Sequence, residues 1–130
     1  MVSYRETFAK GERLCSKKTI AEIFEKGRSF YCKSLQVIWI IGPESIPFPA
    51  QVAFSVSRKS FRNAITRNFI KRRLREAYRK KKHLLYQHLQ EKERKISFFI
   101  IFKDTSVPDY KSLEKAIGEA IGKLIQILNE

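Results

Sequence analysis

The fold is decided by residues 54–77, which have the sequence FSVSRKSFRNAITRNFIKRRLREA. At the start of this stretch Phe54 and Val56 alternate with Ser55 and Ser57, the pattern of a β-strand with one apolar face and one small polar face. From residue 61 the apolar spacing changes to three and four residues, which predicts a helix to about residue 82 that continues through residue 89. The chain therefore passes from a sheet strand directly into a long helix.

The segments on either side of this stretch complete an α+β pattern. Ser16 as N-cap and Gly27 as a stop predict a short amphipathic helix over 16–27, and β-branched and aromatic residues predict one strand over 30–41. Residues 96–102 are almost continuously apolar, which is typical of a strand covered on both faces, and apolar residues recur at helical spacing over 113–128. We predict a small two-layer α+β sandwich in the order α, β, β, α, β, α, with a single domain over residues 1–130.

Composition excludes several classes of protein. The 130 residues are 43% hydrophobic and 12% aromatic, too apolar for a disordered basic tail. No apolar run reaches the length of a membrane span, and residues 1–8 contain no secretory signal. Cys15 and Cys32 have neither disulfide-framework nor zinc-ligand spacing, so we expect free thiols and a cytoplasmic protein, without a protein-held metal.

The positive charge is concentrated in one segment. The chain carries 27 Lys and Arg against 13 Asp and Glu, a net charge of +14. Residues 58–82 contain twelve of the basic residues and one acid, Glu76, so 11 of the 14 net charges lie within 25 residues. Gathering one sign of charge creates a local potential that attracts polyanions. A polyphosphate partner is therefore indicated.

A helical wheel separates the basic helix into two faces. The predicted buried stripe consists of Ile70, Leu74, Ala77 and Tyr78. Beside it lies a band that we call the basic row, made of Asn68, Lys71, Arg72, Arg75 and Arg79, with Arg67 at its boundary. Side chains one turn apart lie roughly 5–6 Å from each other, comparable to successive phosphates of a nucleic-acid strand. The alternative is a solvated helix face, but such a face usually pairs Glu with Lys, and this one offers only Glu76.

Residues 54–77 resemble the signature of the bacterial ribonuclease P protein component, in which a strand ending S-V-S-K/R-K leads into G-N-A-V-x-R-N-R-x-K-R-x-x-R-E. The matching positions are Ser57, Lys59, Asn63, Ala64, Arg67, Asn68, Lys71, Arg72, Arg75 and Glu76. The E-R-L of residues 12–14, the first helix, and the last strand and helix extend the resemblance over nearly the whole chain. Two positions depart from it: Arg62 stands where the family usually has Gly, and Phe69 where it has the second Arg of R-N-R.

The resemblance implies that an RNA carries out catalysis and that the protein assists it. In that family a large RNA removes the 5′ leader of precursor tRNA by Mg²⁺-dependent hydrolysis, with Mg²⁺ bound mainly by the RNA, and the basic protein assists. The implied partners are the catalytic RNA, in a 1:1 complex with a protein monomer, and precursor tRNA. The implied fold is that of ribosomal protein S5 domain 2, with a left-handed β-α-β crossover. Taken together, the basic row and the resemblance predict these RNA-binding residues: Arg58, Lys59, Asn63, Arg67, Asn68, Lys71, Arg72, Arg75 and Arg79.

A cleft for the single-stranded leader is also implied, between the sheet, the first helix and the central helix. Leader sequences vary, so stacking platforms and backbone charge suit them better than base-edge contacts. Our candidates are Ile20, Phe24, Ile38, Trp39, Ser55 and Ser57. For the four large side chains the alternative is core packing, and for the two serines it is a solvent-facing position. Phe69 lies outside both helix faces, which leaves stacking on a base and packing on a loop equally open.

The sequence does not assemble a catalytic site in the protein. Asp104 and Asp109 lie in one loop, and His83 and His88 do not share a helical face, so neither paired carboxylates nor a His-based pair is expected. Two other functions compete with the ribonuclease P interpretation. One is a ribosomal or other structural RNA-binding protein, and the other is a binder of membrane surfaces or acidic proteins through the basic helix, which we expect less because its apolar stripe is needed for the core.

Overall fold

We analysed a computed structural model of the chain, which describes residues 8–130. The secretory-signal expectation rests mainly on residues 1–7, which lie outside the described residues. The elements are η1 (Lys10–Glu12), α1 (Lys17–Lys26), β1 (Arg28–Cys32), β2 (Leu35–Ile41), β3 (Ala50–Val56), α2 (Ala64–Glu91), β4 (Ile96–Phe102) and α3 (Tyr110–Leu128). The α+β class predicted from the sequence is confirmed.

The four strands form one mixed sheet in the order β1-β2-β4-β3. β2 is antiparallel to both β1 and β4, whereas β3 and β4 are parallel neighbours connected through α2. This connection is the β-α-β crossover that the family resemblance implies. The predicted burial of β4 on both faces is confirmed, since six of its seven residues are buried. The outer position of β3 leaves one of its edges at the border of the sheet, beneath the basic helix.

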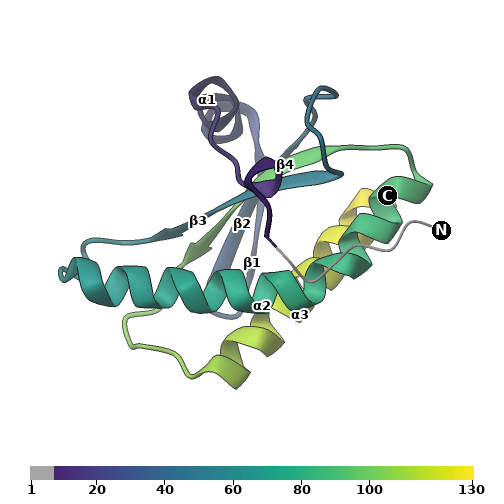
Figure 1. Ribbon diagram of the computed structural model, residues 1–130. Coiled ribbons are helices and arrows are strands. Elements are labelled where there is room, and N and C mark those ends of the chain that lie inside the picture. The colour runs from purple at the N-terminus through teal and green to yellow at the C-terminus, as the bar shows by residue number, and fades with distance from the viewer. Residues whose placement is uncertain (1–7) are drawn as a thin grey trace.

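Helices α2 and α3 pack side by side on one face of the sheet (Figure 1). The main core lies between them and the strands, and its strand residues alternate as the sequence predicts. From α2 it receives Ile70, Leu74, Ala77 and Tyr78, all fully buried, so the predicted stripe is confirmed. Burial of an aliphatic side chain of this size contributes about 1.5–3 kcal/mol. This stripe fixes the rotation of α2 and therefore the direction in which the basic row points.

The short helix α1 lies on the opposite face of the sheet (Figure 1). Its Ile23 packs with Leu14 and Phe99 in a second, smaller core. Ser16 caps the helix by accepting a 3.2 Å hydrogen bond from the Thr19 N–H, and the Gly27 N–H bonds to the Ile23 carbonyl at the other end. Both predicted ends of this helix are confirmed.

The prediction of a single strand over residues 30–41 is wrong. The chain forms a hairpin there, with β1 and β2 joined at Lys33 and Ser34. Lys33 has φ of 53°, and the Ser34 carbonyl accepts a 2.7 Å hydrogen bond from the Lys103 N–H. The turn was missed because it contains no Gly, Asn or Pro, the residues that usually mark a tight hairpin. The added strand β1 extends the sheet beyond the predicted three strands.

The basic helix begins at Ala64 rather than at residue 61. Asn63 adopts an extended conformation and its side-chain oxygen accepts a 2.8 Å hydrogen bond from the Ile65 N–H. Such a cap satisfies one of the backbone donors that a helix start leaves without a partner, so the helix begins immediately after it. Phe61 precedes the cap and is buried in the main core, against Phe102. The helix ends at Glu91, beyond the predicted residue 89.

Candidate nucleic-acid interface

The basic row lies on the surface of α2, next to its buried stripe. Asn68, Arg72 and Arg75 are exposed, and Lys71 and Arg79 are half-buried along their stems. Arg58 and Lys59, in the turn before the helix, are exposed as well. Side chains spaced by three and four residues point in similar directions, so the cationic groups form a continuous positive strip. Most of the predicted RNA-binding residues are thus brought together on one surface.

The N-terminal end of α2 adds to this positive potential. A helix N-terminus carries a partial positive charge, which acidic side chains in the first turn commonly balance. The first turn of α2 contains no acidic residue. Anions are stabilised at such a helix end, because backbone N–H groups and the helix dipole act together. The segment at Arg58 and Lys59, together with the first turns of α2, is therefore suited to binding a phosphate group.

Two predicted RNA-binding residues also hold the local structure together. Asn63 is the helix cap, and the Arg67 guanidinium donates hydrogen bonds of 2.9 Å to the carbonyl oxygens of both Phe61 and Arg62. Arg67 therefore fastens the loop onto the helix. The sequence did not reveal this role, because the carbonyl groups that accept these bonds carry no side-chain signal.

Glu76, the acid within the basic segment, is paired on its own helix. Its carboxylate accepts hydrogen bonds from the Arg79 guanidinium and lies 4.0 Å from the Lys80 ammonium. The hydrogen bond from Arg79 lowers the pKa of Glu76 below its ordinary value. Arg79 is thus partly neutralised by its neighbour, whereas Arg72 and Arg75 form no ion pair among the described contacts.

The face of the sheet that carries α1 is only partly covered. Across the four strands, Tyr31, Gln36, Ile101 and Ser55 are cross-strand neighbours on this face, and we call them the sheet row. Tyr31 is 61% exposed and the other three are half-buried. Phe24 projects from α1 beside them, 56% exposed, with its ring centroid 4.9 Å from that of Phe99. A half-exposed aromatic ring beside a flat, partly polar row is a suitable platform for bases.

The structure brings four of the six candidate leader residues onto this surface. Ile20 and Ile38 pack against the second core, the Phe24 ring contacts Phe99 of that core, and Ser55 belongs to the sheet row. Ser57 lies just beyond β3, where its hydroxyl accepts a 3.1 Å hydrogen bond from the Lys59 N–H.

Trp39 was a wrong choice for that surface. Successive strand residues point to opposite faces, so Trp39 faces the main core when Ile38 faces α1. Its ring is buried, with the Arg28 guanidinium 5.5 Å from the ring centroid.

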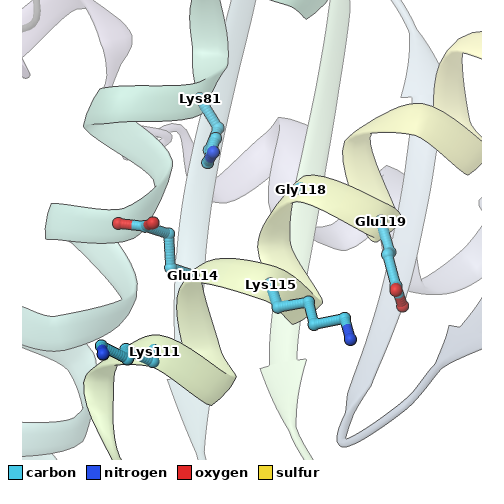
Figure 2. A pocket seen from close by; sticks show the side chains of 6 residues that line it. All are labelled: Lys81, Lys111, Glu114, Lys115, Gly118 and Glu119. Atoms are coloured by element: carbon cyan, nitrogen blue, oxygen red, sulfur yellow. The ribbon is translucent and has the colours of Figure 1, made fainter.

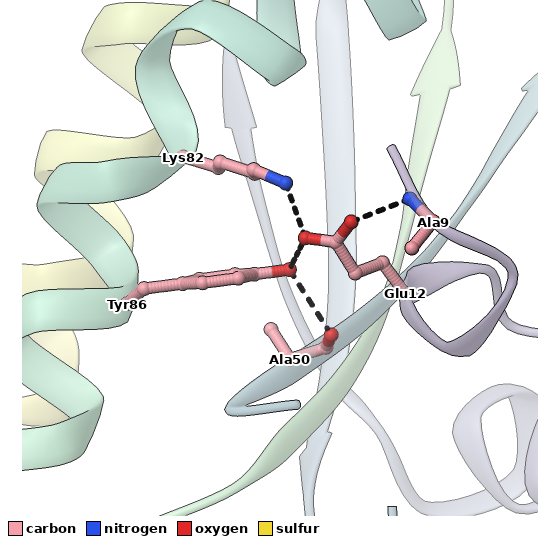
Figure 3. Close-up of polar contacts among 5 residues, drawn as sticks. All are labelled: Ala9, Glu12, Ala50, Lys82 and Tyr86. Carbon is pink, nitrogen blue, oxygen red and sulfur yellow. Dashed lines mark hydrogen bonds and ion pairs between the residues drawn. The ribbon is translucent and has the colours of Figure 1, made fainter. Parts of the chain in front are cut away.

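Lys82 does not contribute to the surface charge counted from the sequence. It is buried and forms an ion pair with the buried Glu12 (Figure 3). The Tyr86 hydroxyl donates a 2.7 Å hydrogen bond to the same carboxylate, and the Ala9 N–H donates one of 2.6 Å. The network joins η1 to α2 across 70 residues of sequence.

The residue spacing in α2 indicates that two members of this network are buried. Lys82 and Tyr86 continue the four-residue repeat of Ile70, Leu74 and Tyr78, which places both on the buried side of α2. The partner was not evident, because Glu12 belongs to a segment whose path depends on tertiary packing.

One surface hollow lies where α3 packs beside α2. It is about 420 Å³, sits between α2 and α3, and is lined by Lys81 from α2 and by Lys111, Glu114, Lys115, Gly118 and Glu119 from α3 (Figure 2). Its three lysines are offset by two glutamates, and Glu119 also pairs with Lys33 at 3.5 Å. This mixed surface lacks the single sign of charge that makes the basic row attractive to a polyanion.

Between residues 8 and 130, no three or more His, Cys, Asp or Glu side chains gather in a way that would hold a metal ion. None of the helices described is both long and apolar enough to cross a membrane. Cys15 and Cys32 are free thiols, the first exposed and the second partly buried.

The shared fold is visible in solved structures. An RNase P protein from Staphylococcus aureus superposes with a TM-score of 0.64 at 21% identity, covering 87% of this chain and 94% of that one. The RNase P protein from Thermotoga maritima gives a TM-score of 0.63 at 18% identity, covering 86% of this chain and 96% of that one. At these identities the likeness establishes the fold.

Sequence comparison identifies the family. A Ribonuclease P protein component from Porphyromonas gingivalis is 34% identical over 113 residues, which cover 87% of this chain and 82% of that protein. One from Petrotoga mobilis is 39% identical over 77 residues, 59% of this chain and 62% of that protein. The sequence pattern of the family described as Ribonuclease P matches residues 8–125, which include β3 and the basic helix. The chain therefore belongs to the ribonuclease P protein family.

Proposed function

We propose that this protein, as a ribonuclease P subunit, binds the catalytic RNA through the basic row and holds the 5′ leader of precursor tRNA on the face that carries α1. In this role it assists the RNA in hydrolysing the bond that joins the leader to the tRNA. The observation that carries the proposal is the position of the family signature. Its basic residues line one exposed side of a helix whose neighbouring stripe is fixed in the core.

The basic row and the sheet row both belong to elements at the edge of the sheet, since α2 packs against β3 and Ser55 lies on β3. Arg75 precedes Lys82 by seven residues, or two turns, so both lie on similar sides of α2, and Lys82 points toward η1. η1 lies against β3, since Arg13 forms a bridge with Val52 and the Leu14 N–H bonds to the Val52 carbonyl. Ser55 of the sheet row is on the same strand. An RNA strand therefore has a short path from the basic row across β3 to Phe24.

Within this arrangement the protein supplies binding and orientation. Arg side chains bind phosphate oxygens in a bidentate way, and a row of them holds a backbone in register. Phe24 offers a stacking surface that tolerates any base, as a leader of variable sequence requires. Holding the substrate beside the catalytic RNA reduces the entropy cost of bringing the two together.

Two acidic side chains between β4 and α3 accept hydrogen bonds from backbone N–H groups. The Asp109 carboxylate caps α3 by accepting a 2.7 Å hydrogen bond from the Ser112 N–H, which lowers the pKa of Asp109. The Asp104 carboxylate accepts a 2.7 Å bond from the Thr105 N–H. These roles favour catalysis by the RNA. Mg²⁺ keeps much of its water and is commonly held by phosphate oxygens, so in this proposal RNA phosphates bind the ion.

Reconstitution tests the proposal. Purified protein is mixed with a bacterial ribonuclease P RNA at a Mg²⁺ concentration too low for the RNA alone, and precursor tRNA cleavage is followed. We expect cleavage at the 5′ end of the mature tRNA to be restored. No restoration, together with recovery of ribosomal RNA as the dominant partner from cells, would support a structural RNA-binding protein instead. Specific cleavage by RNA-free protein would contradict the assignment of catalysis to the RNA.

A further inference from the structure

Two large apolar side chains are exposed in the most basic part of the molecule. Ile65 is 78% exposed and Phe69, one turn later on α2, is 38% exposed. Neither packs in the two hydrophobic cores of the described residues. Exposed apolar side chains that adjoin one another on a rigid helix commonly mark a binding surface. They require an explanation here because the core of α2 lies on a different side of the helix.

Arg73 completes the cluster. Its guanidinium carbon lies 4.5 Å from the centroid of the Phe69 ring, the geometry of a cation–π contact. Ile65, Phe69 and Arg73 are spaced by four residues and therefore form one stripe along α2. A ring and a planar cation side by side offer two flat surfaces. Nucleobases stack on both kinds of surface.

This stripe is separate from the basic row but adjoins it. Arg72 follows Phe69 by three residues, so the row and the stripe meet at this pair. Phe69 also stands where the family signature has an arginine. At this position the chain therefore has an aromatic ring in place of a phosphate-binding charge.

We propose that Ile65, Phe69 and Arg73 form a stacking site for one unpaired nucleobase, whose phosphate is held by Arg72. This site deepens the proposed RNA binding and rests on it. It differs from the leader surface around Phe24, which lies on the other face of the sheet.

The surrounding charge selects a nucleic acid as the occupant. The first turn of α2 carries no acid, and exposed Arg72 lies one turn from Phe69 on the same helix. A polyanion that also carries flat apolar groups matches both features at once, and single-stranded RNA is such a polymer. Inorganic polyphosphate matches only the charge, which makes it a useful comparison.

The test separates base stacking from charge. Binding of the full-length protein is measured for a short single-stranded RNA, for a strand of the same length with abasic residues, and for inorganic polyphosphate. Phe69→Ala is expected to weaken binding of the RNA about fivefold to 150-fold, the range of base–aromatic stacking. It is expected to leave binding of the abasic strand and of polyphosphate unchanged. Leu84→Ala is the matched control, because Leu84 is an exposed apolar residue of the same helix, 49% exposed.

A second variant at the same position replaces the phenyl ring with an aromatic ring whose fluorescence can be measured. Phe69→Trp introduces an exposed indole, while the chain's single tryptophan, Trp39, is buried and is present in both proteins. We expect the RNA to quench the added fluorescence, and polyphosphate to leave it unchanged. Equal loss of RNA and polyphosphate binding in folded Phe69→Ala, or RNA binding without quenching in Phe69→Trp, overturns the site.

The outcomes also distinguish this site from the proposed function. If reconstituted cleavage is restored but Phe69→Ala binds single-stranded RNA as the unaltered protein does, only the stacking site fails. If the quenching is instead produced by an acidic protein and not by RNA, the occupant is wrong. If the unaltered protein binds no RNA and restores no cleavage, the proposed function itself fails.

Discussion

Glu12 and Lys82 form a buried ion pair that joins η1 to the middle of α2 (Figure 3). Each side chain is almost completely excluded from solvent, and Tyr86 donates a further hydrogen bond to the carboxylate. The pair therefore belongs to the framework that holds η1 against the basic helix. Lys82 is one of the twelve basic residues of segment 58–82, but its charge lies in the protein interior and not on the RNA-binding surface.

Removing one member of this pair is expected to destabilise the fold. Lys82→Met leaves the Glu12 carboxylate buried without its cation, which costs about 3–5 kcal/mol when a buried pair is broken. Urea unfolding measures this loss. The double variant Glu12→Gln with Lys82→Met is expected to lose less than the sum of the two single changes. Additive losses would show that the two side chains are not coupled.

Arg72→Ala is expected to weaken RNA binding and to reduce its salt dependence. Each lost phosphate contact lowers the slope of log K against log salt by about 0.7–0.9, because fewer counterions are released. Titrations at several salt concentrations measure the slope. Lys92→Ala, an exposed cation just beyond the last turn of α2, is the control and is expected to keep the slope. An unchanged slope and affinity for Arg72→Ala would remove this residue from the interface.

Phe24→Ala is expected to impair binding of the leader specifically. Loss of a stacking ring costs about 1–3 kcal/mol per base, so the assembled ribonucleoprotein is expected to bind precursor tRNA more weakly and mature tRNA as before. Ile41→Ala is the matched control, because Phe24 and Ile41 are both 56% exposed but Ile41 lies at the far end of β2. A similar loss for both RNAs would argue against a leader-specific role.

Gly27→Ala is expected to destabilise the end of α1. A Cβ atom at Gly27 would lie 2.2 Å from the Ile23 carbonyl oxygen and 2.8 Å from Cγ2 of Ile38. Overpacking of this kind costs about 1–3 kcal/mol. Gly122→Ala in α3 is the control, since its Cβ meets nothing within 4 Å and it is expected to stabilise the helix by about 1 kcal/mol. Thermal unfolding compares the two, and equal effects would refute a close contact at Gly27.

Two buried tyrosines predict a loss of stability at high pH. Burial raises the pKa of Tyr78 and of Tyr86 above the ordinary value of 10.0. The unfolded chain therefore ionises first as the pH rises, so their contribution to stability is complete below pH 10 and is lost above it. Urea unfolding at a series of alkaline pH values measures this. Tyr78→Phe, which keeps the ring and removes one ionisable group, is expected to flatten the decline, and an identical decline would contradict the role of Tyr78.

Local patterns predicted the elements with strong chemical signals. Ser16, Gly27, the alternation in β3 and the almost continuous apolar run of β4 act through neighbours in sequence, and the structure confirms each of them. The hairpin at Lys33 was missed because its turn depends on contacts with β4 and not on a turn-forming residue. Trp39 was misplaced because alternation shows which residues share a face but not which face carries the open surface.

By itself the sequence determined the α+β class, the family and the presence of a basic row on one helix, because these depend on composition and on spacings of two to four residues. Tertiary structure alone decided which charges stay at the surface. Lys82 is drawn inside by Glu12, Arg67 fastens a loop, and Arg72 and Arg75 remain available for a partner. The physical reason is that a charge is retained in the interior only where a distant segment supplies its counter-charge, and which segment arrives there is set by the packing of the whole chain.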